Sequence, residues 1–173
     1  MSNLTEQKQK ANGLRKAGNF KEALLLYRNL WKETGDRFDG AGLLHCLRKV
    51  ELFDEAIVLA DELIVKYPDF EWCRNEAIWT YIQGILDKFN EEEPFERVVE
   101  IANRIMNLNP TGLAAKLTVF KVLKSAKSSN HWEAVNERKF FLRLNALAKH
   151  LLGNLPESER IYQNLSRDYK PGW

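Results

Sequence analysis

The chain has 173 residues, of which 45% are hydrophobic and 29% are charged. This composition excludes a disordered, collagen-like or mucin-like chain, and the length suits one domain with a buried core better than two. Because 26 Lys and Arg residues face 24 Asp and Glu residues, the net charge is only +2, which excludes a protein that binds polyanions through its overall charge.

Amphipathic helical segments alternate along the chain, with apolar residues at the 3.6-residue period of a helix. The first helices of five pairs are predicted at 4–15, 39–49, 70–89, 112–127 and 140–152. Each is followed by a turn and a second helix, which begins near Phe20, Phe53, Phe95, Trp132 or Leu155. Pro68, Pro110 and Pro171 end three pairs, because proline cannot continue a helix. Between Pro110 and Leu152 we expect one long helix, from about Trp132 to Leu152, that serves two pairs.

The helical pairs are internal repeats. Residues 17–30 align with residues 50–63, and Ala23 and Leu30 coincide with Ala56 and Leu63. Small residues such as Ala11 and Ala23 allow two helix backbones to approach closely. One pair of this kind cannot bury its apolar face alone, so neighbouring pairs must stack. The sequence therefore predicts an all-α fold, an α-solenoid of antiparallel helix pairs.

The repeat resembles the tetratricopeptide repeat (TPR), whose unit has about 34 residues. The best copy is Gly18-Asn-Phe-Lys-Glu-Ala23 through Tyr27, with a small residue, Gly, an aromatic residue, Glu-Ala and a second aromatic residue in order. The resemblance implies a right-handed superhelix of about four to five repeats in a single domain over 1–173. The repeats are expected at 4–36, 37–69, 70–110 with an insertion at 87–93, 111–138 in degenerate form, and 139–172.

Residues suited to catalysis or metal binding are scarce. None of the three histidines, His45, His131 and His150, has a second ligand at metal-binding spacing on its helix. No Gly-rich phosphate loop or Gly-x-Ser-x-Gly motif occurs. The sequence therefore predicts no catalytic residue, no metal and no cofactor, and thus a protein that is not an enzyme. Cys46 and Cys73 are expected to be buried free thiols.

The first helix of each repeat is expected to line a concave groove, in which proteins of the TPR family bind extended peptides or partner helices. The candidate partner-binding residues are Lys8, Asn12 and Arg15 in the first repeat, His45 and Arg48 in the second, and Trp72, Asn75 and Trp79 in the third. Two alternatives stay open: core packing for the tryptophans, and an ordinary solvated face for the polar residues.

Some TPR domains hold a carboxyl terminus in a clamp of five cationic and amide side chains. Lys8 and Asn12 match the first two clamp positions, but Gly42 stands at an Asn position and Glu76 near a cationic one. A complete clamp is therefore not expected.

A basic strip is predicted in segment 111–130, which contains no acidic residue but contains Lys116, Lys121, Lys124 and Lys127. Acidic residues precede it in segment 91–100. The strip is either a solvated helix face beside an acidic insertion or a surface for an acidic peptide or a nucleic-acid backbone. Because the lysines are spread over a broad face, nucleic-acid binding would be weak and sensitive to salt.

The function expected from these observations is that of a non-catalytic protein-interaction or scaffold module, with a protein or peptide partner of acidic character. The alternatives are a nucleic-acid-associated accessory protein that uses the lysines of segment 111–130, and a regulatory subunit of a larger complex. Without an apolar run long enough for a signal peptide or a membrane span, a cytoplasmic location and no membrane contact are expected. Apolar residues in the last copy, such as Ile161 and Leu165, suggest self-association as a further role.

Overall fold

The computed structural model describes residues 3–128, which form α-helices and one 3₁₀ turn with no β-strand in that range. The all-α prediction is confirmed for this part of the chain. Two compact units divide the chain at Lys88 and Phe89, inside the predicted insertion 87–93. The helices predicted at 140–152 and after Leu155, and the long helix that was expected to begin near Trp132, lie outside the described residues.

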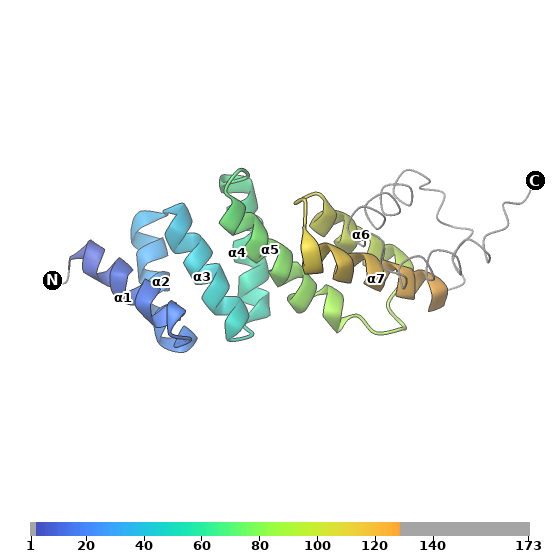
Figure 1. Cartoon of the computed structure of the whole chain (residues 1–173), viewed down its shortest axis with the longest axis horizontal. Helices are drawn as coiled ribbons and strands as arrows, with labels where there is room; N and C mark the ends of the chain where they lie inside the picture. Colours follow the sequence, from blue (N-terminus) through green and yellow to red (C-terminus); the bar gives the residue numbers. More distant parts are fainter. Residues whose placement is uncertain (1–2, 129–173) are drawn as a thin grey trace, which may run out of the picture. The chain divides into compact units, whose positions relative to one another are not determined.

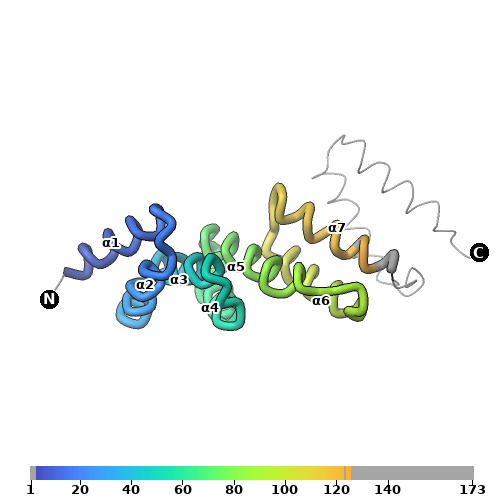
Figure 2. The backbone as a smooth tube through the Cα atoms, turned by 90° about the horizontal axis from the view of Figure 1, so that it is seen from below, coloured from blue at the N-terminus to red at the C-terminus, as the bar shows by residue number. Residues whose placement is uncertain are grey.

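The first unit contains five helices followed by the short turn η1. The helices are α1 (Leu4–Lys16), α2 (Phe20–Thr34), α3 (Arg37–Lys49), α4 (Phe53–Lys66) and α5 (Glu71–Gly84), and η1 spans Leu86–Lys88. Figure 1 and Figure 2 show these helices following one another in chain order. Each helix packs on its neighbours in the chain, and α3 also contacts both α1 and α5. The odd-numbered helices α1, α3 and α5 therefore form a continuous row within this unit.

Local sequence explains where these helices begin and end. Asn3 and Asp36 cap α1 and α3, because their side chains accept hydrogen bonds from the backbone N–H groups of Thr5 and Phe38. Gly35 ends α2 in the left-handed conformation, with φ of 57°. The predicted helix starts at Phe20 and Phe53 are confirmed.

The helix predicted at 70–89 is shorter in the structure. α5 ends at Gly84, whose backbone lies so close to Phe53 that an added Cβ would be 3.0 Å from the ring. Ile85 then leaves the helical conformation, with φ of −126° and ψ of −64°. The turn η1 then begins at Leu86, whose side chain is fully buried. The helix was predicted to extend to residue 89 because Leu86 and Phe89 continue the apolar spacing of a helix.

Small residues in α3 let α2 and α3 approach closely. An added Cβ at Gly42 would lie 2.5 Å from Cζ of Tyr27, and one at Gly40 would lie 2.9 Å from the Trp31 ring. Ala23 and Ala56 have no exposed surface, as predicted for residues at helix contacts. The first unit is therefore built on glycine and alanine contacts between successive helices.

The second unit is described as far as residue 128. It contains α6 (Phe95–Met106) and α7 (Gly112–Ser128), which pack against each other. One face of α6 is buried, with Val98, Ile101 and Ile105 almost completely shielded from solvent. No helix in the described part of the chain is both long and apolar enough to cross a membrane.

Candidate functional site

Polar and aromatic side chains from α1, α3 and α5 meet on the row that these helices form. We call them the α1/α3/α5 cluster, which consists of Asn12, Arg15, His45, Arg48, Trp72, Glu76 and Gln83. Five of the seven were predicted as partner-binding residues. Their spacing on each helix places them on one side of it, because residues three or four positions apart share a helix face.

Glu76 of α5 is the centre of the cluster. Its carboxylate accepts a hydrogen bond from His45 Nδ1 at 2.9 Å and from Trp72 Nε1 at 3.3 Å. Arg48 donates to it through Nη2 at 2.8 Å and through Nε at 3.1 Å. Burial by itself raises the pKa of Glu76, but the His45 hydrogen bond and the charge of Arg48 outweigh burial and lower it below the ordinary value. Glu76 is therefore a buried anion that joins α3 to α5.

Arg48 belongs to the interior of the molecule. It is only 8% exposed, and its Nη1 donates to Gln83 Oε1 at 3.0 Å besides the two bonds to Glu76. The alternative of an ordinary solvated face is therefore wrong for this residue. Its direct role is therefore to hold α3 against α5.

Arg15 of α1 lies over Trp72 of α5. Its guanidinium carbon is 4.9 Å from the centre of the indole ring, and its Nη2 donates to Asn12 Oδ1 at 2.8 Å. Its Nε is shielded from solvent and has no hydrogen-bond partner. The cation–π contact orients the guanidinium plane, while one donor stays unsatisfied.

Lys8 is paired separately with Asp39 of α3. Lys8 Nζ lies 2.9 Å from Asp39 Oδ2, which also accepts a hydrogen bond from Thr34 at 2.7 Å. The hydrogen bond from Lys8 to Asp39 raises the pKa of Lys8 above its ordinary value, and burial opposes this effect only in part. The charge of Lys8 is thus already balanced within the first unit.

The remaining predicted residues of this face, Asn75 and Trp79, are accessible. Asn75 is exposed and Trp79 is partly exposed, as is Trp72. Complete core packing therefore does not describe either tryptophan. Trp72 within the α1/α3/α5 cluster and Trp79 on the same helix therefore add aromatic surface to this face.

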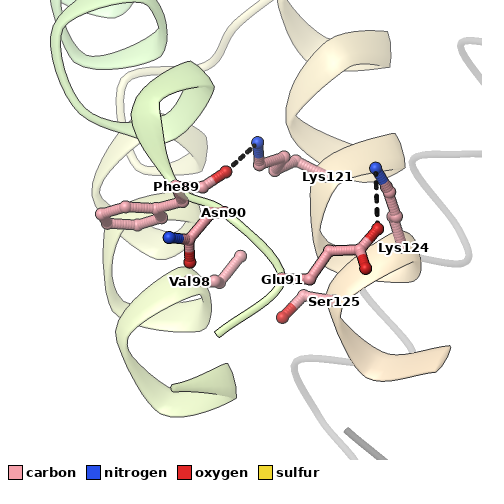
Figure 3. A pocket seen from close by; sticks show the side chains of 7 residues that line it. All are labelled: Phe89, Asn90, Glu91, Val98, Lys121, Lys124 and Ser125. Atoms are coloured by element: carbon pink, nitrogen blue, oxygen red, sulfur yellow. Dashed lines mark hydrogen bonds and ion pairs between the residues drawn. The ribbon is translucent and has the colours of Figure 1, made fainter. Parts of the chain in front are cut away.

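The lysines of the predicted basic strip lie on α7 in the second unit, and two of them contact the segment that precedes α6. Figure 3 shows Lys121 and Lys124 pointing towards this segment. Lys121 Nζ donates to the carbonyl oxygen of Phe89 at 2.8 Å, and Lys124 lies 3.6 Å from a carboxylate oxygen of Glu91. Lys116 lies over the Phe120 ring, with its Nζ 5.7 Å from the ring centre. The side chain of Lys127 lies outside the described part of the structure.

Sequence analysis missed Asp39 and Gln83, and it considered Glu76 only as a mismatch to a clamp. A signal was present for Glu76, because it lies next to Ala77 and Ile78 on a largely apolar helix. A carboxylate on a buried face needs a charged partner. Helical periodicity shows that the Glu76 carboxylate needs a charged partner, but it does not identify Arg48, which is 28 residues away, as that partner.

The described residues hold no group of three His, Cys, Asp or Glu side chains that could bind a metal ion. Cys46 and Cys73 are buried free thiols, as expected, and burial raises the pKa of each to about 11. Comparison of the chain with protein-family models, with curated proteins and with solved structures gave no match.

Proposed function

We propose that the chain is a non-catalytic protein-interaction module with a TPR-like α-solenoid architecture of antiparallel helix pairs. Its partner, an extended segment or a helix, binds to the row formed by α1, α3 and α5. The contacts of α3 with both α1 and α5 support this architecture, because alternate helices are neighbours when helix pairs stack.

The observation that carries the proposal is the α1/α3/α5 cluster itself. Three helices that are not consecutive in the sequence contribute to one connected group of polar side chains, in which Arg15 lies on Trp72. Trp72, and Trp79 on the same helix, are partly exposed. Tryptophan and arginine are enriched among the residues that dominate binding energy at protein interfaces.

The proposal assigns binding rather than catalysis to His45 and Glu76. Both carboxylate oxygens of Glu76 already accept hydrogen bonds, from Arg48, His45 and Trp72. A carboxylate held in this way is suited to fixing the positions of its neighbours. Preorganised side chains reduce the entropy that is lost when a partner binds.

Site-specific photo-crosslinking tests this proposal. A photoreactive amino acid replaces Asn75, which is exposed on the proposed binding face, and in a matched variant it replaces Val65, which is 82% exposed on α4. We expect a protein partner to crosslink from position 75 and not from position 65. Equal crosslinking from both positions, or crosslinking from position 65 alone, would contradict the proposed face.

The alternative functions and the cytoplasmic location stay predictions from the sequence. For the nucleic-acid alternative, Lys121 and Lys124 would have to exchange their contacts with Phe89 and Glu91 for phosphate groups. No contact of the described residues favours this exchange, so we develop the protein-binding proposal.

A further inference from the structure

One side of α5 carries two tryptophans and two side-chain amides in a straight stripe. We call it the α5 stripe, which consists of Trp72, Asn75, Trp79 and Gln83. These positions are three, four and four residues apart, so they share one side of the helix. Asn75 is exposed and the other three are partly exposed, whereas Ala77 and Ile78 on the same helix are buried. The stripe is therefore an accessible side of α5.

Three hydrogen-bond donors of the α5 stripe have no partner. Gln83 Oε1 already accepts a bond from Arg48 Nη1, which turns the NH2 group of this amide away from Arg48. Among the described residues, no acceptor bonds this NH2 group, the indole N–H of Trp79 or the amide of Asn75. The neighbouring carboxylate of Glu76 is occupied by the bonds described above. The stripe thus presents more donors than acceptors, and it favours a partner that supplies acceptors.

The spacing of the two tryptophans along α5 matches one regular backbone conformation. Seven residues of an α-helix span about 10.5 Å, and three residues of a polyproline II helix span about 9.3 Å and complete one turn. Prolines at positions i and i+3 of such a segment therefore lie on one side of it, at nearly the spacing of Trp72 and Trp79. In a β-strand, residues three apart point to opposite sides, so a strand does not present the same pair.

A polyproline II segment also supplies the acceptors that the α5 stripe favours. Its backbone forms no internal hydrogen bonds, so its carbonyl oxygens stay available, and proline has no N–H group that needs an acceptor. A partner α-helix could place apolar residues seven apart on the two tryptophans, but its carbonyl groups are bonded within the helix. A proline-rich extended segment therefore meets both the spacing and the donors of the stripe.

On the basis of the proposed function, we infer that the partner segment is proline-rich and binds along α5 in the polyproline II conformation. Prolines three residues apart pack on the two tryptophans, as in other aromatic surfaces that bind such segments, and the carbonyl oxygens around them accept hydrogen bonds from the donors of the α5 stripe. The stripe carries no charged side chain, so a neutral segment complements it. Trp72 is already held by its bond to Glu76 and by Arg15 over its ring, which limits the entropy that is lost on binding.

Peptide selection on the full chain tests the inference. The probe is a phage-displayed library of random twelve-residue peptides, and we expect the selected peptides to share two prolines three residues apart. A capped synthetic copy of one selected peptide should lose about tenfold in affinity when both prolines become alanine, because apolar contact with the tryptophans is lost. Moving one proline by a single residue keeps the composition but should weaken binding as much, since the two prolines then face different sides.

Two variants of the protein connect these losses to α5. Trp79→Ala should lower the affinity of the selected peptide about tenfold, and replacing the proline that packs there should then change affinity by less than twofold. Asn75→Ala changes an exposed residue, so the fold is retained, and it should lower affinity about three- to tenfold because a hydrogen bond is lost. The matched control is Asn29→Ala, which removes an exposed asparagine from α2 and should keep the wild-type affinity.

The outcomes separate the inference from the proposed function. Selected peptides without the proline pair, or a peptide whose affinity is unchanged when one proline is moved, would refute the proline-rich partner. If those peptides still lose affinity in Asn75→Ala or Trp79→Ala, the proposed binding face stands. If no peptide is selected, or if the selected peptides bind both variants as tightly as the wild type, the inference and the proposed face are both wrong.

Discussion

The contact between Gly42 of α3 and Tyr27 of α2 predicts that a single methyl group weakens the first unit. In Gly42→Ala the new Cβ would lie 2.5 Å from Cζ and 2.9 Å from Cδ1 of the Tyr27 ring. Carbon atoms normally approach to about 3.5–4.0 Å, so the ring must move by about 1 Å. Tyr27 is only 4% exposed, and its neighbours must therefore move with it.

The magnitude follows from two opposing effects. Overpacking of a core costs about 1–3 kcal/mol, and contact with ring atoms places this site at the upper end of that range. Replacing glycine by alanine inside a helix raises the free energy of unfolding by up to about 1 kcal/mol. We therefore expect Gly42→Ala to lower the free energy of unfolding by about 2 kcal/mol.

Urea denaturation followed by far-ultraviolet circular dichroism measures this change, as a lower midpoint with an unchanged slope. The matched control is Gly13→Ala in α1, where an added Cβ meets no atom within 4 Å. This control should gain about 0.5–1 kcal/mol. If both variants are stabilised alike, the close approach of α2 and α3 at Gly42 is wrong.

The remaining predictions concern three other sites. Glu76→Gln should destabilise the chain by about 3 kcal/mol at neutral pH, because it leaves the buried guanidinium of Arg48 without its carboxylate. The pKa of Glu76 in the folded chain lies below the ordinary 4.5, so the stability that its carboxylate contributes is complete above pH 4.5 and is lost on further acidification. Denaturation at several pH values should therefore show the stabilities of the wild type and Glu76→Gln converging below about pH 4.5. Cys46 and Cys73 should react with a thiol reagent at pH 8 only after unfolding, because burial raises their pKa to about 11, and fast labelling of the folded chain would contradict this. Lys121→Met should speed the exchange of backbone amide hydrogens in segment 89–91 several-fold, because a hydrogen bond worth about 1 kcal/mol is lost. Unchanged exchange would show that the bond from Lys121 to the carbonyl of Phe89 does not hold this segment.

Much of the described fold could be predicted from the sequence, because its signals are local. The turn residues and the aromatic residues that follow them mark the starts of α2 and α4 at Phe20 and Phe53. The end of α5 at Gly84 could not be predicted in this way. Gly84 lies against Phe53, which is 31 residues away in the sequence, and periodicity contains no information on such a contact.

The candidate site shows the same division between local and distant information. Helical spacing places Asn12 and Arg15 on one face of α1, and their hydrogen bond follows from that spacing. Which charges become neutralised depends on pairs between different helices, such as Arg48 with Glu76. For that reason the sequence did not show that Lys8 and Arg48, two of the predicted partner-binding residues, are paired with carboxylates inside the first unit.

The buried pair of Arg48 and Glu76 also restricts how this protein can change during evolution. Loss of either residue alone leaves a buried charge, whereas simultaneous replacement of both by apolar residues of similar volume is nearly neutral. Substitutions at these positions should therefore occur together in descendants of a common ancestor. Correlated exchange at positions 48 and 76 would then identify distant relatives whose overall sequences have diverged.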